Sequence, residues 1–131
     1  MGIALRLACF LLLCCFPVGA ISQQSDRSVE VGVGVVCDTA QQMGRFVALH
    51  TTGSEAEVAI RLVNSEAHDS RACGAGAVAF IPGKAVADLA IKGGTMRVTE
   101  VTIVGTLTPQ GLRAVEPLTQ YTAFFVKSEA A

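Results

Sequence analysis

The chain has 131 residues, of which 51% are hydrophobic, 16% charged and only 5% aromatic. Ten lysine and arginine residues stand against 11 aspartate and glutamate residues, so there is no basic surplus to neutralise phosphates. The length predicts a single domain, and the charge balance argues against a nucleic-acid-binding protein.

The first 20 residues have the pattern of a secretory signal peptide. Arg6 supplies a positive charge, residues 7–16 form an apolar run, and Val18-Gly19-Ala20 places small residues before a cleavage site. The run is too short for a transmembrane helix, which needs about 20 apolar residues. We therefore expect cleavage after Ala20 and export to the periplasm or the cell exterior. The alternatives are an uncleaved anchor and a lipid on a leader cysteine, namely Cys9, Cys14 or Cys15.

Removal of the leader leaves two cysteines, Cys37 and Cys73. An even number of cysteines in an oxidising compartment predicts one disulfide. Closing a loop of this length stabilises a domain by roughly 3.5–4 kcal/mol in the chain-entropy description. We expect the bridge to clamp a domain that also has a core of its own.

The mature chain is expected to begin with a flexible polar arm over residues 21–28, followed by a single α+β domain over residues 29–131. At the start of this domain, valines alternate with Glu30, Gly32 and Gly34, which predicts a half-buried strand. Cys37 has the same parity as the valines, so both should face the core. These valines are Val29, Val31, Val33 and Val35.

Two helices are expected next, as a short hairpin. Asp38 and Gln41 form a partial capping box for the first helix, whose apolar side carries Met43, Phe46 and Val47. Gly53 ends that helix, and the spacing of Ser54 and Glu57 predicts a full capping box for the second. Val58, Ala59, Leu62 and Val63 form the expected buried stripe of the second helix, and Glu57 and Arg61 an expected ion pair on its exposed side.

The pattern after Cys73 predicts an antiparallel meander of four or five strands. The parity of the apolar residues switches between Val98 and Val101, which predicts a bulge or strong bend near Thr99-Glu100. The helical pair should pack on this bent sheet, and an SH3-like barrel is one specific version of that fold. The expected strands are 77–81, 86–91, 96–107, 112–115 and 121–126, separated by Pro82-Gly83, Gly93-Gly94, residues 108–111 and Glu116-Pro117.

Few residues are suited to catalysis or metal binding. His50 and His68 are the only histidines, and neither lies in a metal-binding motif. His68-Asp69-Ser70 contains the residue types of a catalytic triad, but consecutive residues cannot adopt its geometry, so a polar loop is expected. Glu100 and Glu116 lie on separate strands with no sign of a shared cleft. No catalytic, cofactor-binding or metal-binding residue is predicted, and a non-enzymatic domain is favoured.

Two further patterns concern packing and partners. The Gly32/Gly34 and Gly74/Gly76 pairs lack the context of a phosphate loop, so close backbone packing or a sheet edge is expected. Phe124 and Phe125 are adjacent and must face opposite sides of a strand. An uncovered phenylalanine there would mark a partner surface.

Three segments of the mature chain resemble a group of small exported bacterial proteins of unknown function. They are Val-Gly-Val-Val-Cys37-Asp38-Thr39, Ala72-Cys73-Gly74 and Gln120-Tyr121-Thr122-Ala123-Phe124. The resemblance implies an exported, disulfide-linked domain and carries over no functional residues. The favoured hypothesis is a non-enzymatic domain that binds a protein or envelope partner. A small hydrolase or lyase using histidine and carboxylate side chains, and an inhibitor or immunity-type protein, are the alternatives.

Overall fold

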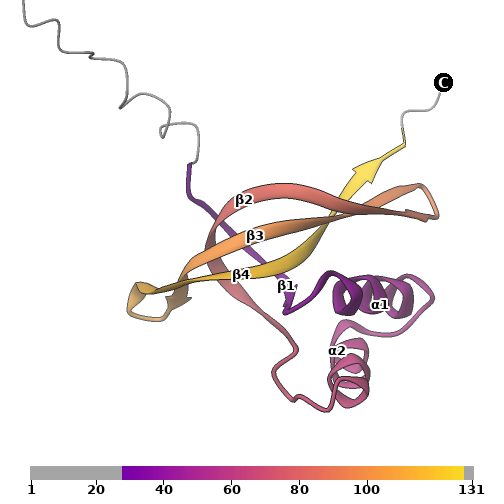
Figure 1. The fold of residues 1–131 in the computed structure, drawn as a ribbon, viewed down its shortest axis with the longest axis horizontal. Coiled ribbons are helices and arrows are strands. Elements are labelled where there is room, and N and C mark those ends of the chain that lie inside the picture. The colour runs from indigo at the N-terminus through magenta and orange to yellow at the C-terminus, as the bar shows by residue number, and fades with distance from the viewer. Residues whose placement is uncertain (1–27, 129–131) are drawn as a thin grey trace, which may run out of the picture.

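A computed structural model describes residues 28–128 as a four-stranded antiparallel barrel with two helices against one side (Figure 1). The predicted signal peptide and residues 21–27 of the predicted arm lie outside the described residues. The α+β class is confirmed, and three strands follow the helices where four or five were expected; the SH3-like version is not confirmed. The elements are β1 (Glu30–Cys37), α1 (Ala40–Thr51), α2 (Ala56–Glu66), β2 (Cys73–Ile91), β3 (Gly94–Thr108) and β4 (Gly111–Lys127).

The two prolines that were expected to separate strands lie inside long ones. Pro82 pairs with Val101 of β3, and the β2–β3 register shifts just after it. Pro117 belongs to a stretch of β4 with no partner on β3, between the pairs Ile103–Leu118 and Gly105–Ala114. A proline is tolerated at such an irregularity because no ladder hydrogen bond from its nitrogen is needed there. The strands therefore bend at these points and continue.

The irregularity predicted near Thr99-Glu100 is present, but the extra residues lie across from these two, on β2. Pro82 pairs with Val101 and Ala85 with Thr99, so β2 is longer than β3 over this stretch. Gly83 allows the close approach, because a side chain there would meet the Glu100 carbonyl oxygen at 2.6 Å. The turn between β2 and β3 is Lys92-Gly93, with Gly93 at a φ of 86°, one residue before the expected Gly93-Gly94.

The parity switch along β3 divides the apolar residues into two cores. Val98 lies in the core between the sheet and the helices, whereas Val101 lies in the core inside the barrel. The helix-side core contains Cys37, Met43, Phe46, Val47, Ala59, Val63, Cys73 and Val98. The barrel core contains only Phe80, Val101 and Ile103 as buried residues.

The helices begin later than the sequence patterns predicted. The capping box of α1 is formed by Thr39 and Gln42, one residue after the expected Asp38 and Gln41. Ser54 caps nothing with its side chain: its backbone N–H donates to the Leu49 carbonyl, so it belongs to the exit of α1. The first residue of α2 is Ala56.

Only half of the predicted stripe of α2 is buried, since Ala59 and Val63 are covered and Val58 and Leu62 are exposed. The expected Glu57–Arg61 ion pair is not among those of residues 28–128. Instead, Arg45 of α1 binds Glu66 of α2, with 3.0 Å between Nη2 and Oε1, and this hydrogen bond and charge raise the pKa of Arg45. The pair joins the two helices rather than two turns of one helix.

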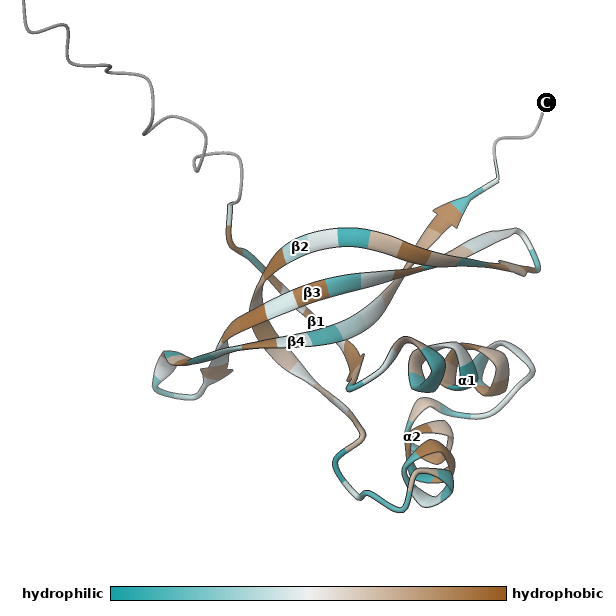
Figure 2. Cartoon of the chain, in the orientation of Figure 1, coloured by the Kyte–Doolittle hydropathy of each residue, from teal (hydrophilic) through white to brown (hydrophobic). Residues whose placement is uncertain are grey.

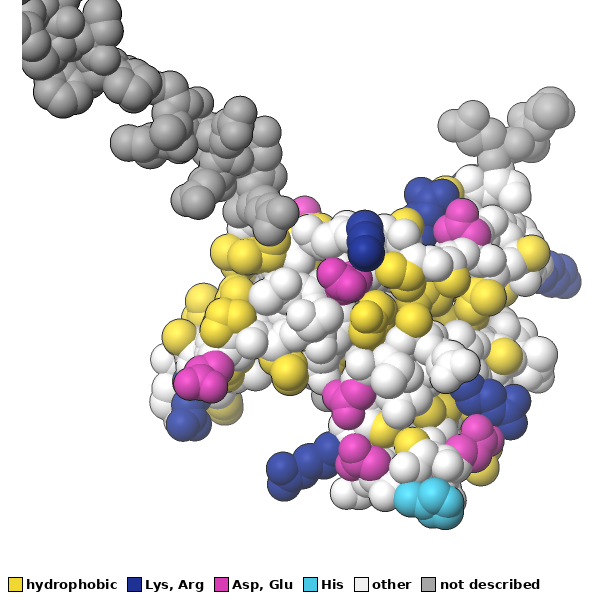
Figure 3. All heavy atoms as spheres, in the orientation of Figure 1, with side chains coloured by type: hydrophobic (Ala, Val, Ile, Leu, Met, Phe, Trp, Pro, Cys, Tyr) yellow, Lys and Arg dark blue, Asp and Glu magenta, His cyan; other side chains and the backbone are white. Residues whose placement is uncertain are grey.

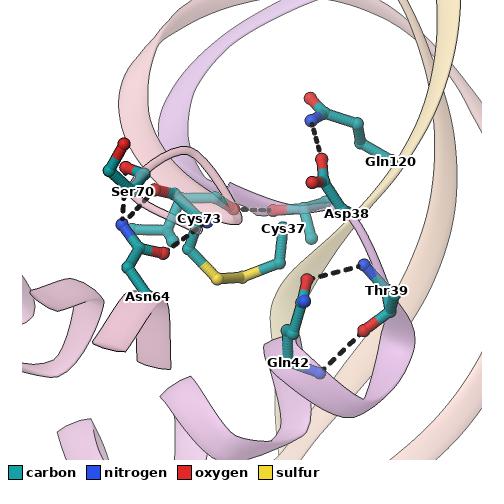
Figure 4. Close-up of a disulfide and its surroundings, with 10 residues drawn as sticks. Cys37, Asp38, Thr39, Gln42, Asn64, Ser70, Cys73 and Gln120 are labelled. Carbon is teal, nitrogen blue, oxygen red and sulfur yellow. Dashed lines mark hydrogen bonds between the residues drawn. A yellow bond between two sulfur atoms is a disulfide. The ribbon is translucent and has the colours of Figure 1, made fainter. Parts of the chain in front are cut away.

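The Cys37–Cys73 disulfide is confirmed and joins directly opposite residues of β1 and β2 (Figure 4). Their Cα atoms lie 4.0 Å apart, and the Asp38 N–H donates to the Ala72 carbonyl at 2.8 Å just beyond the bridge. The Asn64 side chain of α2 accepts from the Cys73 N–H at 2.7 Å and donates to the Cys73 carbonyl at 3.1 Å. Both ends of the helical hairpin are thus fixed at one point of the sheet.

The predicted burial of the β1 valines is wrong for the first part of the strand. Val31 and Val33 are 59% and 86% exposed, whereas Val35 packs against the helix-side core beside Cys37. The reason is that the helices reach only the Cys37 end of β1, as Figure 1 shows. The alternation of valines with Glu30, Gly32 and Gly34 correctly predicted a strand with two different faces. Of the face that carries the valines, only the end next to Cys37 is covered.

Candidate functional site

The barrel is closed at a single residue pair, and this leaves its interior open on both sides of that pair. Cys37 of β1 pairs with Tyr121 of β4, and no other pair joins these strands in the described residues. Two side-chain hydrogen bonds support the closure. The Thr122 hydroxyl donates to the Val35 carbonyl at 2.8 Å, and the Gln120 amide donates to Asp38 Oδ1 at 3.1 Å.

On one side of the closure lies an apolar groove of about 510 Å³, between the start of β2 and the β3–β4 hairpin. This volume falls within the range of roughly 300–1,000 Å³ typical of ligand sites. Figure 2 shows that apolar residues reach this hairpin, and Figure 3 shows hydrophobic side chains gathered on that end of the molecule. The principal side chains of the groove are Val36, Ala77, Val78, Ile103, Leu107, Val115 and Leu118.

The groove owes its depth to Gly74 and Gly76 at the start of β2. A Cβ atom added at either position would meet no atom within 4 Å. The same is true of Gly34, which pairs with Gly76 across the β1–β2 ladder. Of the two expectations for these glycines, close backbone packing is not found at Gly34, Gly74 or Gly76, whereas Gly32 and Gly34 do lie in a strand that pairs with β4 only at Cys37. Gly34, Gly74 and Gly76 leave open space in which larger side chains would stand.

The walls of the groove combine exposed leucines with few polar groups. Leu118 is 53% exposed and Leu107 is 43% exposed, although both lie in strands next to the barrel core. Thr106, Glu116 and Gln120 supply the polar groups of the lining. Glu116 is the single titratable side chain among the lining residues, and most of the other side chains are apolar.

On the other side of the closure is a small cavity of about 70 Å³ between β1 and β4. Its floor is the barrel core, and the Phe124 ring at its edge lies 6.4 Å from the Phe80 ring, centroid to centroid. Phe124 and Phe125 are both exposed, at 40% and 54%. The expectation that an uncovered phenylalanine marks a partner surface therefore stays a prediction, now with two candidates.

The tripeptide His68-Asp69-Ser70 forms the exit of α2, as predicted for a polar loop. His68 has a positive φ of 52°, and the Asp69 carboxylate accepts from the Arg71 N–H at 2.9 Å. Ser70 contributes its backbone carbonyl to Asn64 at 3.0 Å. No hydrogen bond joins the three side chains in the part of the chain that the structure describes. These residues shape a turn and carry no nucleophile–base contact.

His50 is placed at the end of α1, where its ring stacks on Phe46 with 5.5 Å between centroids. Its Nδ1 lies 2.9 Å from the Ser54 carbonyl oxygen, so it fastens the turn between the helices. The carboxylates of Glu100 and Glu116 are not brought together at the groove, because Glu116 lines it and Glu100 does not. Among residues 28–128, no group of three potential metal ligands comes together.

The sequence pattern gave little sign of the groove. Leu107 and Val115 each stand at the end of a predicted strand, and Leu118 falls between the predicted strands 112–115 and 121–126. The one available signal was Pro117 between Val115 and Leu118, because a proline within an apolar strand marks an edge or an irregularity. The residues that face them come from the start of β2, far away in sequence.

Comparison of the chain with protein families, with curated proteins and with solved structures finds no match. Within the described residues, none of the helices is both long enough and apolar enough to span a membrane.

Proposed function

We propose that this protein is an exported, non-catalytic binding domain that holds an apolar segment of a protein partner in the groove between β2 and the β3–β4 hairpin. The observation that carries the proposal is the groove itself, which presents Leu107, Val115 and Leu118 to solvent beside a glycine floor. Covering one such side chain completely contributes about 1.5–3 kcal/mol. Leu107, Val115 and Leu118 are already about half covered, so only part of this contribution remains to be gained from each, and the groove supplies the apolar centre of a larger contact.

The distribution of polar groups favours binding over hydrolysis. Glu116 is the titratable residue of the groove, whereas His50 and His68 lie at the ends of α1 and α2 on the helix side. A hydrolase or lyase would need catalytic side chains in contact with one another. A hollow at the exit of α2 is lined by His68, Asp69 and Ser70, but no hydrogen bond joins these side chains in the described part of the chain, and Asp69 accepts from the Arg71 N–H. The groove instead resembles the apolar centre of an interface, with a polar margin at Thr106, Glu116 and Gln120.

Export is the second part of the proposal. The leader with Arg6, its short apolar run and Val18-Gly19-Ala20 supports it, and so does a disulfide, which persists in oxidising compartments. Intact-mass analysis of the protein from the producing cell should give a mature chain that begins at Ile21. Retention of Met1, or a lipid on Cys14 or Cys15, would contradict cleavage after Ala20.

The binding proposal is tested by matched leucine variants of the mature chain. Leu118→Asp places a charge in the groove, and Leu62→Asp places the same charge on the exposed side of α2, far from it in the fold. Both variants should keep the thermal unfolding midpoint of the wild type. A photo-reactive residue at position 115 should cross-link one protein of the envelope or secreted fraction in the wild-type and Leu62→Asp backgrounds, and not in the Leu118→Asp background. Equal cross-linking in all three would contradict the groove as the binding site.

A further inference from the structure

The free edge of β1 is a second unpaired feature of the fold, separate from the groove. β1 pairs with β2 from Glu30 to Cys37, but with β4 only at Cys37. The other edge of residues 30–36 therefore pairs with no strand among the described residues, and near Gly32 and Gly34 it borders the small cavity beside Phe124 of β4. An open edge presents a row of backbone donors and acceptors to solvent and is a template for another strand.

The hydrogen bond from the Thr122 hydroxyl to the Val35 carbonyl shows which residues face this edge. Residues along an antiparallel strand alternate in the edge to which they point their N–H and C=O groups. Val31 and Val33 share the parity of Val35, so their backbone groups point to the same open edge. Val35 is engaged by Thr122, which leaves the stretch from Glu30 to Gly34 free for pairing.

The side chains at this edge are apolar and lack the usual protection. Val31 and Val33 are largely exposed, and Val29 beside them is exposed as well. Edge strands are normally shielded by lysine, proline, a bulge or a covering loop. The stretch 29–36 contains no lysine or proline, and its register with β2 is regular throughout.

We infer that a second copy of this chain pairs antiparallel with the free edge of β1, in a register centred on Gly32. The edge is self-complementary in this register, because Val31 of each copy then lies opposite Val33 of the other. Glu30, the only charged residue of β1, lies opposite Gly34, so no like charges meet and the glycine leaves room for the carboxylate. A register centred on Glu30 would instead oppose two carboxylates.

The first test is the molar mass of the mature chain by light scattering, at concentrations from about 1 to about 100 µM. We expect a mass that rises to that of two chains. Val33→Lys should raise the Kd of the dimer at least about tenfold, since it places a charge on the paired edge. Val86→Lys, at an exposed valine of β2, should leave the Kd unchanged. A monomer at every concentration, or an unchanged Kd in Val33→Lys, would overturn the inference.

A cysteine pair tests the register directly. In Gly32→Cys the two new thiols meet at the two-fold axis, so oxidation should link the copies covalently. In Gly34→Cys each thiol lies opposite Glu30 of the other copy, and no link should form. Both positions accept the side chain: an added Cβ meets only the Phe80 ring at 3.4 Å at position 32, and nothing within 4 Å at position 34. Equal linking of both variants, or linking of Gly34→Cys alone, would overturn this register.

Discussion

The helix side and the barrel side of this domain are built from the same strands but differ in how firmly they are held. The helix-side core has eight buried residues, a disulfide and the Asn64 hydrogen bonds at one point of the sheet. The barrel core has three buried residues and opens into a groove on one side and a cavity on the other. We therefore expect stability to be concentrated on the helix side, where the chain is clamped, whereas the groove with its exposed leucines lies on the barrel side. Binding surfaces are commonly found at the less stable end of a structure.

Removal of the clamp should have the largest effect. The double variant Cys37→Ala and Cys73→Ala should lower the free energy of unfolding by about 2–5 kcal/mol, because the unfolded chain is no longer constrained. Urea denaturation of the mature protein measures this loss. Reduced wild-type protein is the control and should show a similar loss. A loss under about 1 kcal/mol would show that the helix side does not depend on its bridge.

Truncation in each core compares their packing. Met43→Ala, in the sealed helix-side core, should cost about 2–5 kcal/mol of unfolding free energy. Ile103→Ala should cost at least about 1 kcal/mol less, because Ile103 borders both openings and the space that it leaves joins them instead of forming a closed cavity. Thermal and urea unfolding of the two variants provide the values. Equal losses would contradict a difference in packing between the two cores.

The link between α2 and the sheet can be tested at Asn64. Asn64→Ala removes the acceptor for the Cys73 N–H and the donors to the Cys73 and Ser70 carbonyls. We expect a loss of about 1–3 kcal/mol in unfolding free energy, because partly buried backbone groups lose their partners. Asn64→Asp keeps an acceptor but has no donor, so its unfolding free energy should lie between that of the wild type and that of Asn64→Ala. If Asn64→Asp matches the wild type, the donated bonds contribute nothing.

The smallest expected effects concern the helix caps. Thr39→Ala removes the capping box of α1 and should cost about 1 kcal/mol of unfolding free energy. Ser54→Ala should change it by less than about 0.5 kcal/mol, because the Ser54 side chain caps neither helix. Chemical denaturation of both variants under the same conditions checks the order. A larger loss in Ser54→Ala would restore the cap that the sequence predicted.

The features that sequence predicted well depend on neighbours along the chain or on strict pairing rules. Cys37 and Cys73 are the two cysteines outside the predicted leader, so each has one partner. The parity switch between Val98 and Val101 follows from the period of two. The capping box of α1 was predicted to within one residue, because Asp38 and Thr39 compete for the same N–H groups, whereas the capping box predicted at Ser54 and Glu57 was wrong. Cysteine number, strand periodicity and helix caps can be read from the sequence itself, without knowing which elements pack against which.

The features that were missed depend on contacts between distant segments. Pro82 and Pro117 look like strand ends, yet the structure places each at an irregularity where no ladder hydrogen bond is required of it. Val31 and Val33 are exposed because the helices cover only the Cys37 end of β1. The alternation of valines along β1 holds no information about which part of the strand the helices cover. The groove, likewise, exists only once the start of β2 meets the β3–β4 hairpin.

The position of the disulfide has a consequence for proteolysis. The bridge closes the segment with both helices into a covalent ring, and the turn at Thr52-Gly53 is one exposed point of that ring. A single cut there would open the ring without releasing either piece, since Cys37 and Cys73 remain on opposite fragments. The nicked protein would keep β1 beside β2 and migrate as one species on a gel until reductant separated it into two.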